Sequence, residues 1–123
     1  NGNIPDTTKL QEFLKGHHIS TRKLNDSGMM AAAIACQLEQ GLSLPDAIAA
    51  CYPLFTGVFS AVAMNQDTLI AFRDQHGIRP LSLGKLEDGS HVVASETCAL
   101  DTIGATVERE IAPGEMVSSQ QMA

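Results

Sequence analysis

Residues 73–81 of the chain read Arg73-Asp74-Gln75-His76-Gly77-Ile78-Arg79-Pro80-Leu81, a charged stretch between two apolar runs. Gly77 and Pro80 are typical of a tight turn, because glycine tolerates positive φ angles and proline restricts φ. The aspartate and histidine of this stretch invite a catalytic interpretation, since histidine is the usual acid or base near neutral pH. We favour a structural loop between strands, in which Arg73 and Asp74 can pair.

The segments on either side of this loop have the apolar and β-branched character of strands. Two hairpins are expected, and their strands are placed at residues 58–64 with 68–73 and at residues 81–85 with 91–95. A short helix is expected at residues 96–103. Two further strands, at residues 106–111 and 115–118, flank a Pro113-Gly114 turn.

The first half of the chain carries helix signals instead. Asp6-Thr7-Thr8 offers an N-cap for a helix that ends at Gly16. Asn25-Asp26-Ser27 can cap a second, largely apolar helix over residues 28–40. A third helix is expected to start at residues 43–46, with a proline in its first turn, and to end before Pro53. Helices followed by hairpins predict an α+β fold with helices packed on an antiparallel sheet.

Composition narrows the functional classes. The 123 residues suffice for one domain, and the net charge of −6, without any basic run, argues against a nucleic-acid partner. No apolar stretch approaches the length needed to cross a membrane. Three cysteines without CxxC spacing indicate reduced thiols, so we expect a cytoplasmic protein.

Four segments together resemble a known family. Asn1-Gly2-Asn3, residues 57–64, residues 73–81 and the stretch Ala94-Ser95-Glu96-Thr97-Cys98-Ala99-Leu100-Asp101 are similar to the glutaminase domain of amidophosphoribosyltransferases. These enzymes are class II glutamine amidotransferases. The resemblance implies the αββα sandwich of N-terminal nucleophile hydrolases. Residues 1–123 would be the C-terminal portion of one incomplete domain, a fragment without the N-terminal cysteine nucleophile.

The resemblance assigns roles to three residues. Asn1 and Gly2 match an oxyanion hole, in which a side-chain amide and a backbone N–H stabilise the tetrahedral intermediate. Without the resemblance, an Asn-Gly pair more often marks a turn. Asp26 matches the aspartate that binds the α-ammonium group of glutamine, although Gly28 stands where the family has glutamate. From local sequence alone, Asp26 is more often a helix N-cap.

The function that the resemblance implies is hydrolysis of glutamine, which supplies ammonia for phosphoribosylamine formation in purine biosynthesis. We expect the chain alone to be inactive and to bind no cofactor. The parent's second, phosphoribosyltransferase domain would be its partner and would use phosphoribosyl pyrophosphate and magnesium. Exposed apolar surface would favour a homo-oligomer. The alternatives are a non-catalytic binding or scaffold paralogue, which the glycine at position 28 favours, and another class II amidotransferase.

Other reactive side chains have plainer interpretations. Cys98 follows an acidic and a hydroxyl residue, and a thiolate near a helix start can be reactive. We predict that it packs in the core instead, as do Cys36 and Cys51. His17 and His18 are adjacent, and adjacent residues rarely point at one metal ion, so a solvated loop is expected there.

Overall fold

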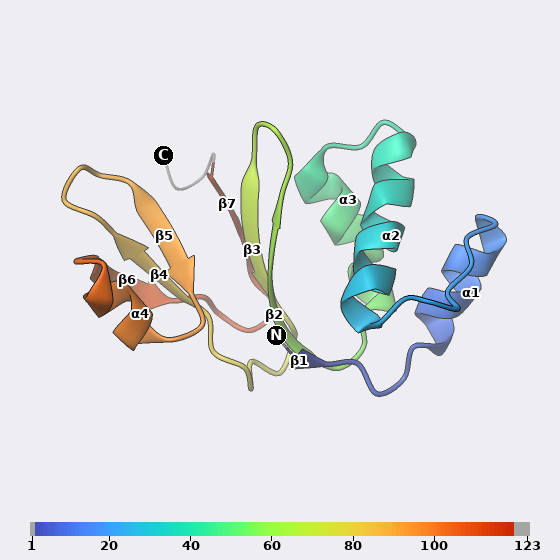
Figure 1. Cartoon of the computed structure of the whole chain (residues 1–123), viewed down its shortest axis with the longest axis horizontal. Coiled ribbons are helices and arrows are strands. Elements are labelled where there is room, and N and C mark those ends of the chain that lie inside the picture. Colours follow the sequence, from blue (N-terminus) through green and yellow to red (C-terminus); the bar gives the residue numbers. More distant parts are fainter. Residues whose placement is uncertain (1, 120–123) are drawn as a thin grey trace. The chain divides into compact units, whose positions relative to one another are not determined.

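The computed structural model describes residues 2–119, apart from the side chain of Asn3. The chain divides into two compact units, which are described separately (Figure 1). The helical unit comprises Asn3–Gly57. The sheet unit comprises Asn1–Gly2 and Val58–Ala123.

The helical unit contains α1 (Thr8–Gly16), α2 (Asp26–Glu39), α3 (Leu44–Cys51) and the short 3-10 helix η1 (Tyr52–Leu54). These helices lie within a few residues of the predicted positions. Their apolar faces are buried, with Leu10 and Leu14 on α1, Met29, Ala33 and Ile34 on α2, and Ala47 and Ile48 on α3. The expected stops are confirmed, because α1 ends at Gly16 and α3 ends before Pro53.

The caps of the helices follow from local sequence. Ser43 accepts a hydrogen bond from the backbone N–H of Asp46 at the start of α3, and a proline lies in the first turn. At the start of α2, the Asn25 side chain accepts from the Gly28 N–H over 2.8 Å. Such side-chain caps satisfy backbone donors that have no partner within the helix.

The sheet unit contains two antiparallel sheets. One has the strand order β1-β2-β3-β7, and the other has the order β5-β4-β6. The strands are β1 (Gly2–Asn3), β2 (Val58–Met64), β3 (Leu69–Arg73), β4 (Ser82–Lys85), β5 (His91–Ala94), β6 (Thr106–Glu110) and β7 (Met116–Ser118), with helix α4 (Thr97–Thr102) after β5. Both predicted hairpins are confirmed, since β2 pairs with β3 and β4 pairs with β5.

The division into two sheets agrees with the sandwich that the resemblance implies, whereas the pattern of helices and hairpins alone predicts one sheet. β6 and β7 flank one turn, yet β6 pairs with β4 and β7 pairs with β3. The turn itself is tied to the end of β3, because Gly114 N–H donates to the Asp74 carbonyl over 2.7 Å. The chain therefore leaves one sheet and enters the other at Pro113-Gly114.

One hydrophobic cluster joins the two sheets within this unit. Its buried members come from both sheets and the connections between them, and they are Ala71, Leu81, Leu83, Ile111 and Val117, with Val93 packed against them. Each of its buried leucine, isoleucine and valine side chains contributes about 1.5–3 kcal/mol relative to an exposed one. The cluster thus fixes the strands that lead into and out of the loop at residues 74–80.

Candidate functional site

The loop that follows β3 is held by a buried arginine. Arg73 is only 3% exposed. Its guanidinium donates hydrogen bonds to three backbone carbonyls, those of Arg79 (2.9 Å), Ile111 (2.6 Å) and Gly77. It also forms an ion pair with Glu110 at 3.2 Å. The planar fork of the guanidinium suits such a role, because its five donors point in fixed directions.

The neighbouring aspartate also binds backbone groups of the loop, but its negative carboxylate accepts hydrogen bonds where Arg73 donates them. Asp74 is 2% exposed, and its Oδ1 accepts from the backbone N–H of Phe59 over 2.9 Å. Its Oδ2 accepts from the N–H groups of His76 (2.8 Å) and Gly77 (3.1 Å). Burial alone would raise the pKa of Asp74, but these three backbone donors outweigh it and lower the pKa below its ordinary value.

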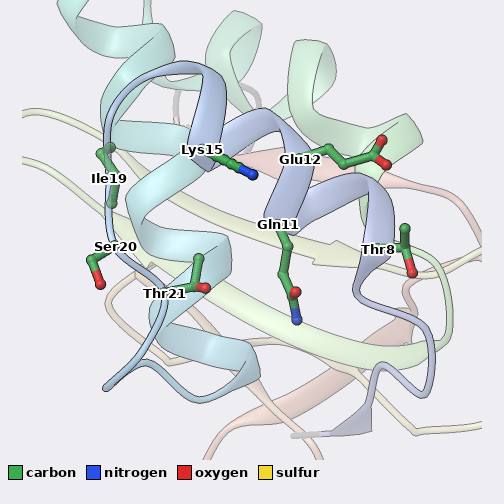
Figure 2. A pocket seen from close by; sticks show the side chains of 7 residues that line it. All are labelled: Thr8, Gln11, Glu12, Lys15, Ile19, Ser20 and Thr21. Carbon is green, nitrogen blue, oxygen red and sulfur yellow. The ribbon is translucent and has the colours of Figure 1, made fainter.

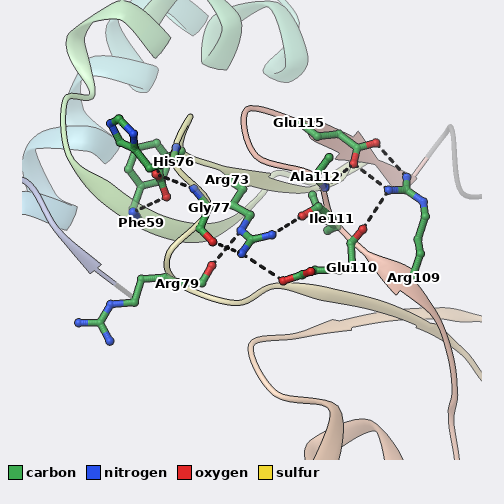
Figure 3. A network of polar contacts seen from close by, with 11 residues as sticks. Phe59, Arg73, His76, Gly77, Arg79, Arg109, Glu110, Ile111, Ala112 and Glu115 are labelled. Atoms are coloured by element: carbon green, nitrogen blue, oxygen red, sulfur yellow. Dashed lines mark hydrogen bonds and ion pairs between the residues drawn. The ribbon is translucent and has the colours of Figure 1, made fainter.

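These contacts confirm the prediction of a structural loop. The two charged side chains bind backbone groups within the loop and in neighbouring segments. Figure 3 shows the contacts of the Arg73 guanidinium. His76 is exposed, and its described hydrogen bond uses the backbone N–H rather than the imidazole. Gly77 has φ +65°, and a Cβ atom there would lie 2.5 Å from Cγ of Pro113. The loop is therefore tied to its surroundings by backbone contacts of both side chains.

A second ion pair closes the turn after β6. The two guanidinium nitrogens of Arg109 contact both carboxylate oxygens of Glu115, at 2.7 and 2.9 Å (Figure 3). Glu115 also accepts from the Ala112 N–H over 2.8 Å. The hydrogen bond with Arg109 is the main reason that the pKa of Glu115 is lowered.

The predicted oxyanion residues are described in part. Asn1 lies outside the described residues. Gly2 belongs to β1, at the edge of the four-stranded sheet, and is exposed with φ +146°. A Cβ atom at position 2 would lie 2.1 Å from the Val58 carbonyl oxygen and 2.6 Å from Cα of Phe59. Only glycine fits this close approach of two backbones.

In the helical unit, Asp26 is the first residue of α2 and is half-buried. The interpretation of Asp26 as the N-cap is wrong, because Asn25 has the extended backbone of an N-cap and its side chain makes the cap contact. Asp26 Oδ2 instead accepts from the backbone N–H of Ile4, at 3.2 Å. The sequence carries no sign of this partner, because every residue except proline has a backbone N–H.

Gly28, which follows Asn25 and Asp26 along the chain, lies in a tight part of the same turn. A Cβ atom there would lie 3.2 Å from both the Asn25 Oδ1 atom and Cδ2 of Leu24. Because that spacing is closer than ordinary van der Waals contact, a side chain would press on the capping contact. The absence of a side chain at position 28 therefore leaves room for the capping contact of Asn25.

The three cysteines divide into two kinds. Cys36 and Cys51 are buried, as predicted, and burial raises the pKa of Cys51 to about 11, with a contribution from Cys36. Burial also raises the pKa of Cys36. The prediction that Cys98 packs in the core is wrong, because Cys98 is exposed and its thiol contacts the Glu96 carboxylate at 3.4 Å. α4 is so short that Leu100 is its one buried residue.

An open pocket of about 470 Å³ lies in the helical unit, beside α1 and the segment that follows it (Figure 2). Its lining residues are Thr8, Gln11, Glu12, Lys15, Ile19, Ser20 and Thr21. None of these is a predicted site residue. Across residues 2–119, no group of three or more His, Cys, Asp or Glu side chains could hold a metal ion. The helices of this range also lack the length and apolar character needed to cross a membrane.

Comparison with known proteins adds a family match and close relatives. The family described as "Glutamine amidotransferase domain" matches residues 1–102. The amidophosphoribosyltransferase of Synechocystis is 41% identical over 123 residues, which cover 95% of this chain and 24% of that protein. The Bacillus subtilis amidophosphoribosyltransferase is 35% identical over 117 residues, with 95% of this chain and 24% of that protein covered.

A solved structure shows the same fold. The glutamine phosphoribosylpyrophosphate amidotransferase of B. subtilis, determined in complex with ADP and GMP, matches with a TM-score of 0.84 at 35% identity. The match covers 96% of this chain and 25% of that chain. The α+β prediction is confirmed, because the helices and antiparallel sheets match the N-terminal nucleophile hydrolase fold of that enzyme. The chain spans about a quarter of the length of these relatives.

Proposed function

The chain belongs to the glutamine amidotransferase domain family, and from this premise we propose that it is part of the glutaminase domain of an amidophosphoribosyltransferase. In this role the domain hydrolyses glutamine and supplies ammonia for phosphoribosylamine formation in purine biosynthesis. The observation that carries the proposal is the 41% identity to an amidophosphoribosyltransferase over 95% of the chain. Residues 1–123 would form the C-terminal portion of this class II glutaminase domain.

Gly2 and Asn1 are the proposed donors to the oxyanion that develops on the glutamine amide carbon. A backbone N–H and a side-chain amide stabilise such a charge, and loss of one donor typically lowers kcat by about 10²–10³-fold. The glycine is supported by its environment, because the backbone of Val58 approaches position 2 too closely for any side chain.

Asp26 is the proposed ligand of the α-ammonium group of glutamine. Its carboxylate lies at the start of α2, where the helix dipole stabilises negative charge. It is not needed as the helix cap, since Asn25 performs that function. The half-buried position of Asp26 is compatible with contact to a ligand.

The nucleophile of this chemistry is a thiol whose base is its own α-amino group. Cys36, Cys51 and Cys98 are internal residues and have no free α-amine. The first two are also buried, and both have raised pKa values. We therefore expect none of these three cysteines to act as the nucleophile and the chain alone to be inactive.

Glutamate release from glutamine tests this function. The longest natural form of the protein should release glutamate, and the 123-residue chain should release no more than a heat-treated sample. The signal of the longer form should disappear after alkylation of its N-terminal thiol. Glutamate release by the chain alone, or none by the longer form, would contradict the proposal.

The remaining parts of the proposal concern the rest of the enzyme. The domain would work beside a phosphoribosyltransferase domain, which would take phosphoribosyl pyrophosphate and magnesium. We place the protein in the cytoplasm, which the free thiols support. The longer form should make phosphoribosylamine from glutamine only when both ligands of that second domain are added, whereas glutamate release should persist without magnesium.

Self-association is also proposed. Val62 and Met64, which alternate along β2, are 52% and 74% exposed, and exposed apolar side chains on one strand favour contact with a second copy. Light scattering at increasing concentration should show a dimer or larger species. A monomer at every concentration would refute this part.

A further inference from the structure

We propose that Asp26 is a positioning residue for the backbone at Ile4, two positions along the chain from Gly2, besides being a ligand of glutamine. The catalytic consequence rests on the proposed glutaminase function. The positioning itself rests on a contact within the helical unit and can be tested without any activity.

The contact joins two segments that are far apart in sequence. The Ile4 N–H donates to Asp26 Oδ2 over 3.2 Å, across 22 residues of chain. Ile4 is only 4% exposed. If the carboxylate were removed, water could replace it only poorly, so the N–H would lose most of its hydrogen bonding.

Asp26 is available for this contact because Asn25 takes over the capping role. A carboxylate has two oxygens and about four acceptor positions. Within the described part of the chain, only Oδ2 has an acceptor role, toward Ile4. Oδ1 can therefore accept from an ammonium group while Oδ2 holds the backbone.

The distance along the chain from Ile4 to the proposed oxyanion donors is short. One residue, Asn3, separates Ile4 from Gly2, so the two lie at most about 7 Å apart along an extended chain. A displacement of about 1 Å in a catalytic group can lower a rate by about 10²-fold. An anchor at Ile4 therefore restrains the chain two positions from the proposed donor at Gly2.

Amide hydrogen exchange on the 123-residue chain tests the anchor directly. Asp26→Ala removes both oxygens, whereas Asp26→Asn keeps one uncharged acceptor for the Ile4 N–H. Exchange at the Ile4 amide should be about 10-fold faster or more in Asp26→Ala, as loss of a charge-assisted bond implies. In Asp26→Asn it should remain within about 3-fold of the wild-type rate, because a neutral hydrogen bond persists.

Asp46→Ala is the matched control. Asp46 also lies in the first turn of a helix, α3, and is exposed. Its replacement removes a similar interaction with a helix dipole but should leave exchange at Ile4 unchanged. Equal exchange at Ile4 in wild type, Asp26→Ala and Asp26→Asn would overturn the proposal.

Kinetics in the longest natural form test the consequence. Loss of the ammonium contact should raise KM for glutamine in both Asp26 variants. Loss of positioning should lower kcat in Asp26→Ala by about 10-fold or more relative to Asp26→Asn, since only the alanine variant frees the Ile4 segment. Identical kcat values in the two variants would show that Asp26 acts as a ligand alone.

The two possible failures are distinguishable. If the longest form releases no glutamate, the proposed function fails, while the exchange experiment still decides whether Asp26 anchors Ile4. If glutamate is released and the Ile4 amide is insensitive to Asp26, the positioning role fails and the glutaminase assignment stands.

Discussion

Replacement of Asp74 by alanine should destabilise the sheet unit strongly, because one carboxylate serves three backbone donors. The Phe59 N–H is buried, so its loss of a charged acceptor costs about 2–3 kcal/mol. The N–H groups of His76 and Gly77 are nearer solvent and would recover hydrogen bonds to water, at about 0.5–1 kcal/mol each. The free energy of unfolding should fall by about 4 kcal/mol.

Urea unfolding followed by circular dichroism measures this loss. Asp88→Ala is the matched control, because Asp88 makes a similar local contact, from the Ser90 N–H at 2.8 Å, but is exposed. The control substitution should lower the urea concentration at the unfolding midpoint far less than Asp74→Ala does. Equal small changes in the two variants would refute the view that Asp74 holds the loop.

The effect of Asp74 should also depend on pH. Its pKa is lowered in the folded state from an ordinary value of 3.8, so the charged form stabilises the fold above that value. This contribution is lost as the pH falls through the lower, folded-state pKa. Asp74→Asn mimics the protonated side chain, so the difference in unfolding free energy between wild type and Asp74→Asn should be full at pH 7 and shrink below pH 3.8. A difference that grows on acidification would contradict the assigned direction.

Two other perturbations test the loop and the thiols. Gly77→Ala should lower the free energy of unfolding by about 2–3 kcal/mol, because it combines a left-handed backbone with a close contact to Pro113, whereas Gly89→Ala, with φ +91° and open space, should cost only about 1 kcal/mol. Equal losses in urea unfolding would show that Pro113 moves aside. Iodoacetamide should label Cys98 in the native chain and Cys51 only after unfolding, because Cys51 is buried and its pKa is about 11. Peptide mass spectrometry identifies the labelled residues. Labelling of Cys51 in the native chain would contradict this assignment.

Much of the local structure was predictable from short-range patterns. The β2–β3 hairpin follows from two apolar runs around a polar turn, and the start of α3 follows from a serine cap and a proline. Cys98 shows the limit of this reasoning, because a short helix presents few positions to a core and sequence does not say which. Leu100 took the buried position that was expected for the cysteine.

The sequence by itself determined the family, through four segments spread along the chain. It also determined the α+β class and the order of helices and strands, because these depend on patterns of neighbouring residues. Only the tertiary structure decided what the charged residues do. Arg73 bonds to a carbonyl 38 residues away, and Asp74 bonds to an amide 15 residues away. Backbone groups are the same at nearly every position, so no pattern of side chains marks them as partners. The sequence thus favours a structural loop at residues 73–81 but does not name its partners, since folding alone brings those amides and carbonyls to the two charges.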